Sequence, residues 1–130
     1  MPEIIVAAEE QVPAVRDLVR EMMDAGGFSG GEITRVVTAA AELTRNMVRW
    51  GGGGVLRADW VTEGAREGIA LVFEDQGAGI DDLDRAMRDG YSTGDALGLG
   101  LPGAARLVDV FQIDTHPGRG TRVEIKQWKR

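Results

Sequence analysis

Residues 69–80 carry the sequence Ile-Ala-Leu-Val-Phe-Glu-Asp-Gln-Gly-Ala-Gly-Ile, an apolar run that ends in a carboxylate and two closely spaced glycines. Alternate side chains of a strand share one face, so Asp75 points the same way as Phe73, at the end where the strand leaves the core. A carboxylate in that place can accept a hydrogen bond from an exocyclic amine. Gly77 and Gly79 would let a flat ring approach the backbone. A turn with a capping Asp explains this stretch alone equally well.

Two further stretches suit the handling of phosphate. Residues 98–103, Gly-Leu-Gly-Leu-Pro-Gly, precede an expected helix, and N–H groups at a helix N-terminus can hold an anion without a lysine. Glu42 and Asn46 lie one helical turn apart. The Glu could act as a general base, and the Asn oxygen could bind Mg²⁺. Taken singly, a surface loop and a solvated polar face are the simpler interpretations.

The composition excludes several classes of protein. The chain has 130 residues, 43% of them hydrophobic and 28% charged, which predicts a single soluble domain spanning residues 1–130. A net charge of −6 argues against a nucleic-acid partner. Cys is absent, and His116 is the single His, which excludes thiol catalysis and multi-His metal sites. The two Lys residues, Lys126 and Lys129, cannot serve a P-loop or an ordinary protein kinase.

The sequence contains no apolar run long enough to span a membrane and no signal-peptide pattern at its start. We therefore expect a cytoplasmic protein without a membrane partner.

The order of expected elements indicates the fold class. Ser29 and Glu32 are spaced as a capping box that starts a helix, and Pro13 suits the first turn of an earlier helix. Because the strands come in hairpins, the order predicts an α+β two-layer sandwich: a mixed, mainly antiparallel sheet with helices on one face. The expected strands are 3–8, 55–63, 69–75, 111–116 and 121–128, with a turn at 64–68 and later helices at 82–88 and 102–108.

Four motifs follow one another along the chain: Glu-Leu-Thr-Arg-Asn at 42–46, Asp-Gln-Gly-Ala-Gly at 75–79, Gly-Leu-Gly at 98–100 and Gly-Thr at 120–121. In this order they resemble the motifs of the GHKL superfamily of ATPases and kinases. The resemblance covers nearly the whole chain and implies the Bergerat ATP-binding fold. Within the superfamily the chain is similar to the single-domain serine/threonine kinases of the anti-sigma regulatory class, above all to the switch kinases of the stressosome. No Lys or Arg lies between Arg88 and Arg106, whereas anti-sigma factors usually carry a longer basic lid.

The resemblance implies a role for each matched position. Asp75 would bind the adenine amine, Asn46 would hold Mg²⁺, and Glu42 would be the catalytic residue that orients or deprotonates the acceptor hydroxyl. The glycine-rich stretch at 98–100 would wrap the phosphates of ATP. The residues implied to bind the cofactor are Asn46, Asp75, Gly77, Gly79, Gly98, Leu99, Gly100 and Thr121.

The resemblance also implies partners. The chain would be an ATP-dependent protein serine/threonine kinase of a partner-switching pathway that phosphorylates STAS-domain proteins and, when released, activates a PP2C-type phosphatase by binding. The alternative is an anti-sigma factor with kinase activity that sequesters a sigma factor. A third possibility, a partner-binding domain with a degenerate nucleotide site, is disfavoured because Glu42 and Asn46 are both present.

Overall fold

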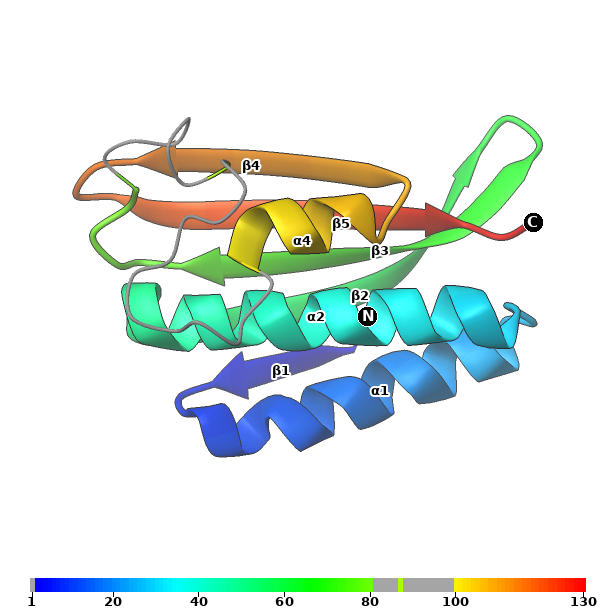
Figure 1. Ribbon diagram of the computed structural model, residues 1–130, viewed down its shortest axis with the longest axis horizontal. Helices are drawn as coiled ribbons and strands as arrows, with labels where there is room; N and C mark the ends of the chain where they lie inside the picture. Colours follow the sequence, from blue (N-terminus) through cyan, green and yellow to red (C-terminus); the bar gives the residue numbers. More distant parts are fainter. Residues whose placement is uncertain (1, 81–86, 88–99) are drawn as a thin grey trace.

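The computed structural model describes residues 2–80, 87 and 100–130, which form a layer of helices against a five-stranded sheet (Figure 1). The helix expected at 82–88 lies, except for Met87, outside the described residues. The described elements are β1 (Glu3–Val6), a 3-10 turn (Glu9–Gln11), α1 (Val12–Ala25), α2 (Gly30–Gly51), β2 (Gly54–Glu63), β3 (Arg66–Asp75), α4 (Gly100–Arg106), β4 (Val110–His116) and β5 (Gly120–Trp128).

The predicted start of α2 is confirmed in atomic detail. The Ser29 hydroxyl accepts a hydrogen bond from the Glu32 N–H at 3.1 Å, and the Glu32 carboxylate accepts the Ser29 N–H at 2.7 Å. This reciprocal pair satisfies two N–H groups that a helix start otherwise leaves unpaired. Pro13 lies in the first turn of α1, also as predicted. The apolar stripes of the two helices are buried at Val12, Val15, Val19, Met23, Val36, Val37, Ala40, Leu43 and Met47.

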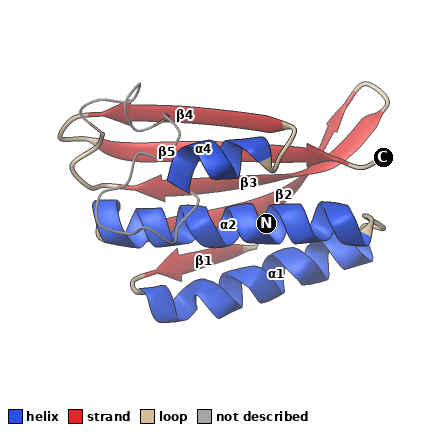
Figure 2. Cartoon of the chain, in the orientation of Figure 1, coloured by secondary structure: helices blue, strands red, loops and turns tan. Residues whose placement is uncertain are grey.

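The sheet confirms the predicted fold class. Its strand order is β1-β2-β3-β5-β4, and every pairing among the described strands is antiparallel. Figure 2 shows α1, α2 and α4 on one face of this sheet. β3 lies at the centre, and its alternate residues Leu71 and Phe73 are buried under α2 as the period of two requires. No described helix is long and apolar enough to cross a bilayer.

The ends of several elements differ from the sequence prediction. The β2–β3 hairpin closes through Gly64 and Ala65, because Glu63 already pairs with Arg66, whereas the sequence predicts a turn at 64–68. The strand residues next to this turn are exposed, so they carry no apolar alternation to reveal them. The last helix, α4, spans Gly100–Arg106, so it begins and ends two residues before the expected bounds of 102–108.

Asp109 holds the end of the chain against the start of β4. Its Oδ2 accepts hydrogen bonds from the Gln127 side-chain amide at 3.0 Å and the Trp128 N–H at 3.1 Å. Its Oδ1 accepts one from the Arg130 guanidinium at 2.7 Å. Burial alone would raise the pKa of Asp109, but the hydrogen bonds from Arg130 and Trp128 and the charges of Arg130 and Arg35 outweigh it, so the pKa lies below its ordinary value.

Candidate active site

Asp75 closes β3 on the core face of the sheet, with only 9% of its surface exposed. Its Oδ1 accepts the Gly77 N–H at 2.9 Å and the Thr121 N–H at 3.2 Å. No described residue donates a hydrogen bond to Oδ2. The carboxylate is therefore held by one oxygen and offers the other to a ligand that carries a hydrogen-bond donor.

The glycines around Asp75 are explained by close approach of protein to protein. A Cβ on Gly51, at the end of α2, would lie 2.3 Å from the Asp75 carboxyl carbon, and one on Gly77 would lie 2.5 Å from the Gly51 Cα. Gly79 has a φ of +77°, and a Cβ there would lie 2.3 Å from the His116 carbonyl oxygen. From the sequence we expected Gly77 and Gly79 to admit a flat ring. In the described structure, their lack of a side chain lets the loop pack against α2 and the β4–β5 hairpin.

Thr121 links the loop after β3 to β4, the strand at the edge of the sheet. Its N–H binds Asp75, and its hydroxyl lies 2.8 Å from the hydroxyl of Thr115 on β4. The Thr115 hydroxyl in turn accepts the Ile80 N–H at 2.9 Å. Sequence reasoning missed Thr115, although the register of the final hairpin, which pairs it with Thr121, could have indicated it.

Glu42 and Asn46 lie on α2, as predicted, in its C-terminal half. The Glu42 carboxylate is 13% exposed and accepts a hydrogen bond at 2.9 Å from the Arg45 guanidinium, which is itself 27% exposed. The Asn46 side chain forms no hydrogen bond with another described residue. Because α2 rises about 1.5 Å per residue, Asn46 lies roughly two turns or less from Gly51, where the helix meets Asp75. The fold thus brings the Glu42–Asn46 motif and Asp75 to one end of α2.

The glycine-rich stretch is only partly described. Gly100 begins α4, which packs against α2. Gly98 and Leu99 lie outside the described residues. Within the described ranges, no group of three or more His, Cys, Asp or Glu side chains could hold a metal ion.

A groove of about 720 Å³ lies between α1 and α2 beside Glu42. Arg16 and Arg20 line it from α1, and Arg45 and Arg49 line it from α2; we call it the arginine groove. Only the packing of the two helices brings the four arginines together. The remaining lining is mostly apolar or hydroxylated and consists of Ile33, Thr34, Val37, Thr38 and Ala41.

Comparisons with known proteins agree with this architecture. Residues 5–126 match the model of the histidine kinase-like ATPase domain family. The chain is 36% identical over 125 residues to the serine/threonine-protein kinase RsbT of Bacillus subtilis, an alignment that covers 96% of this chain and 94% of the relative. It is 30% identical over 102 residues to an anti-sigma F factor of Clostridium kluyveri, covering 74% of this chain and 70% of the relative.

Two solved structures share the fold at low sequence identity. The RsbU and RsbW domains of a Mycobacterium tuberculosis protein superpose with a TM-score of 0.66 at 21% identity, over 100% of this chain and 33% of that one. The mycobacterial sensor histidine kinase MprB superposes with a TM-score of 0.58 at 17% identity, over 99% of this chain and 97% of that one.

Proposed function

We propose the substrate class of this chain and a role for each residue of its site, starting from its family. The chain belongs to the histidine kinase-like ATPase family and is a protein serine/threonine kinase of the partner-switching type that uses ATP. It transfers the γ-phosphoryl group of ATP to a Ser or Thr of a STAS-domain protein in the cytoplasm. When released from that protein, it binds and activates a PP2C-type phosphatase. The observation that carries the proposal is the match to RsbT along nearly the whole chain, with Glu42 and Asn46 both present on α2.

Asp75 is proposed to select adenine. Its Oδ2 is the acceptor for the adenine amine, since Oδ1 is already engaged by the N–H groups of Gly77 and Thr121. Thr121 acts by holding the carboxylate, and Gly77 and Gly79 act by keeping the loop close to α2 and to the hairpin. Oδ2 accepts no hydrogen bond from a described residue, so it is open to a ligand that carries a donor in this place.

Asn46 is proposed to hold Mg²⁺, which supplies charge neutralisation between the phosphates. Mg²⁺ in nucleotide sites usually has one or two protein ligands and completes its shell with phosphate oxygens and water. The free amide of Asn46 suits that donor set, and the described residues offer no richer one nearby. Gly98, Leu99 and Gly100 are proposed to contact the phosphates through their backbone N–H groups.

Glu42 is proposed to be the catalytic base. The acceptor hydroxyl oxygen forms a bond to the γ-phosphorus, the bond from that phosphorus to the bridging oxygen breaks, and ADP leaves. The hydroxyl proton passes to the Glu42 carboxylate. Positioning and charge stabilisation provide most of the catalysis in such transfers, so Arg45, which holds this carboxylate at 2.9 Å, contributes by orienting it.

The test is phosphoryl transfer to purified STAS-domain proteins with ATP and Mg²⁺, with the modified residue located by mass spectrometry. Glu42→Gln should bind ATP normally and lower the transfer rate by roughly 10²–10⁴-fold, the usual contribution of a general base. Glu21→Gln, which changes an exposed Glu of α1, is the matched control and should transfer at the wild-type rate. Normal transfer by Glu42→Gln would leave Glu42 as a polar residue of the helix surface.

The similarity to anti-sigma F factors supports a second candidate, an anti-sigma factor that also has kinase activity. The two candidates share the nucleotide site and differ in the protein that they retain. Pull-downs with STAS-domain proteins, PP2C-type regulators and sigma factors distinguish them. Capture of a sigma factor without phosphorylation of any STAS protein would favour the anti-sigma candidate.

A further inference from the structure

We propose that the arginine groove between α1 and α2 binds an extended acidic segment of the protein substrate and leads its acceptor hydroxyl to Glu42. The proposal rests on the proposed kinase function only for the identity of the molecule to which the segment belongs. The surface itself is defined by residues that sequence reasoning gave no shared role.

The groove is positively charged, whereas the chain as a whole is negatively charged. The whole sequence carries a net charge of −6, yet the groove gathers four arginines beside one glutamate, Glu42. Arg16 forms no ion pair with a described residue, and Arg20 has only a loose one, 3.9 Å from Asp17, with 57% of its side chain exposed. The two residues are about 6 Å apart along the axis of α1, and their guanidinium groups are available to carboxylates of a partner.

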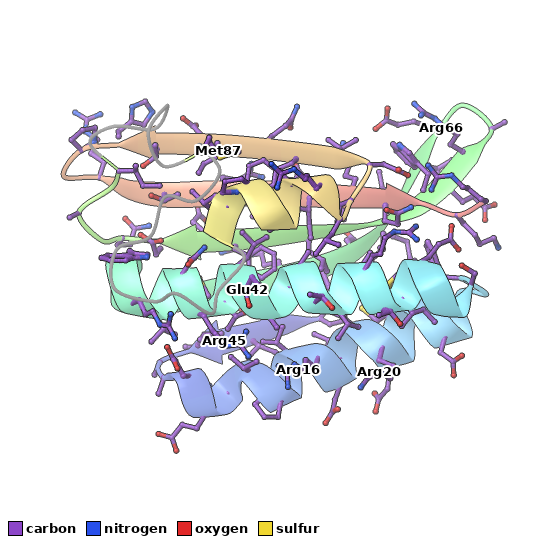
Figure 3. The ribbon with its side chains drawn as sticks, in the orientation of Figure 1. Arg16, Arg20, Glu42, Arg45, Arg66 and Met87 are labelled. Atoms are coloured by element: carbon purple, nitrogen blue, oxygen red, sulfur yellow. The ribbon has the colours of Figure 1, made fainter. Side chains whose placement is uncertain are left out.

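The other two arginines already form ion pairs, so the α1 side and the α2 side of the groove differ. Arg49 pairs with Glu9 at 2.6 Å, and Arg45 pairs with Glu42 at 2.9 Å. The arginines with little or no pairing therefore lie on α1, and the catalytic carboxylate lies on α2. Figure 3 shows Arg16, Arg20 and Arg45 on the same side of the helical layer as Glu42.

The dimensions and lining suit a peptide segment. A volume of about 720 Å³ falls within the roughly 300–1,000 Å³ of typical ligand clefts. The apolar side chains Ile33, Val37 and Ala41 offer contact to an aliphatic residue. Thr34 offers a hydroxyl to a peptide backbone, whereas the Thr38 hydroxyl already donates to the Thr34 carbonyl at 2.8 Å and can only accept. A simple anion would use the arginines alone, so the mixed lining favours an acidic polypeptide. An acceptor in the groove meets Glu42 directly, and the γ-phosphate must lie within about 3–3.5 Å of that hydroxyl.

The test is the binding of a fluorescein-labelled peptide in which one Ser is flanked by Asp residues, with a second peptide carrying Asn in place of every Asp. Fluorescence anisotropy of the intact protein should show binding of the acidic peptide that weakens as salt rises, because exposed charges are screened. The double variant Arg16→Glu/Arg20→Glu should bind it about tenfold more weakly or worse, since each reversal replaces an attraction by a repulsion. Arg16→Gln/Arg20→Gln should lie between the two.

The matched control is Arg122→Glu, which makes the same kind of charge change at a half-exposed arginine of β5. It should leave peptide affinity within about twofold of the wild type, because a charge beyond a Debye length of about 10 Å contributes little. Affinity for ATP, measured by calorimetry, confirms that each variant is folded.

Three binding results would each overturn the groove proposal: no binding of the acidic peptide, equal binding of the Asn peptide, or equal losses in Arg122→Glu and the double variant. The proposed kinase function fails separately, if no STAS-domain protein is phosphorylated while the groove still binds the acidic peptide. Conversely, wild-type phosphorylation kinetics of a STAS protein by Arg16→Glu/Arg20→Glu would refute the groove and leave the kinase function standing.

Discussion

Replacing Asp75 by Asn separates the two uses of its carboxylate. Oδ1 accepts the N–H groups of Gly77 and Thr121 at 2.9 and 3.2 Å, and an amide oxygen can accept both. The other oxygen, which no described residue contacts by a hydrogen bond, becomes an NH₂ group that can only donate. We therefore expect Asp75→Asn to fold and to present a donor to the adenine amine where the wild type presents an acceptor.

The size of the effect follows from the burial of the site. Asp75 is 9% exposed, so water has little access to repair a mismatched pair. A buried polar group left without its partner costs about 1–3 kcal/mol, which is roughly a 5- to 150-fold loss in ATP affinity. Inosine triphosphate carries a carbonyl oxygen in place of the amine. Asp75→Asn should therefore lose affinity for ATP and retain or gain affinity for inosine triphosphate.

Titration calorimetry with the two nucleotides and Mg²⁺ measures both affinities, and urea unfolding measures stability. Asp75→Ala is the companion variant. It leaves the N–H groups of Gly77 and Thr121 without their acceptor, so it should lose about 1–3 kcal/mol of unfolding free energy for each group that water cannot reach. An unchanged ATP affinity in Asp75→Asn, or an equal loss for both nucleotides, would refute the adenine role of this carboxylate.

Two further predictions concern stability. The free energy of unfolding in urea should be about 1–3 kcal/mol lower for Gly79→Ala than for Gly118→Ala. The two glycines have similar φ values, +77° at Gly79 and +79° at Gly118, but only at Gly79 would a Cβ meet the His116 carbonyl oxygen, at 2.3 Å. Equal losses in the two variants would contradict this steric explanation. The lowered pKa of Asp109 stabilises the fold above about pH 4, and this contribution is lost as pH falls through that pKa. Arg130→Ala should therefore show a smaller drop in Tm between pH 7 and acid than the wild type, and an unchanged drop would count against the pair.

Local features of this protein could be predicted from sequence because neighbouring residues decide them. The capping box of Ser29 and Glu32 needs only a spacing of three residues, and it forms as expected. The alternation that ends in Asp75 needs only a strand, and it places that carboxylate on the core face. The ends of β2 and β3 next to the hairpin turn could not be predicted as well, because the exposed residues near Gly64 carry no pattern of burial.

Contacts between distant segments were decided only by the tertiary structure. Nothing in the run Gly51 to Gly54 indicates that its first member must lack a side chain to leave room for Asp75. Likewise, Arg16 and Arg20 are ordinary charges of a helix surface until α1 packs against α2 and places them opposite Arg45. A sequence pattern records which face of an element is apolar, but the partner of each polar side chain depends on how the elements pack, because hydrogen bonds and ion pairs act only over a few ångströms.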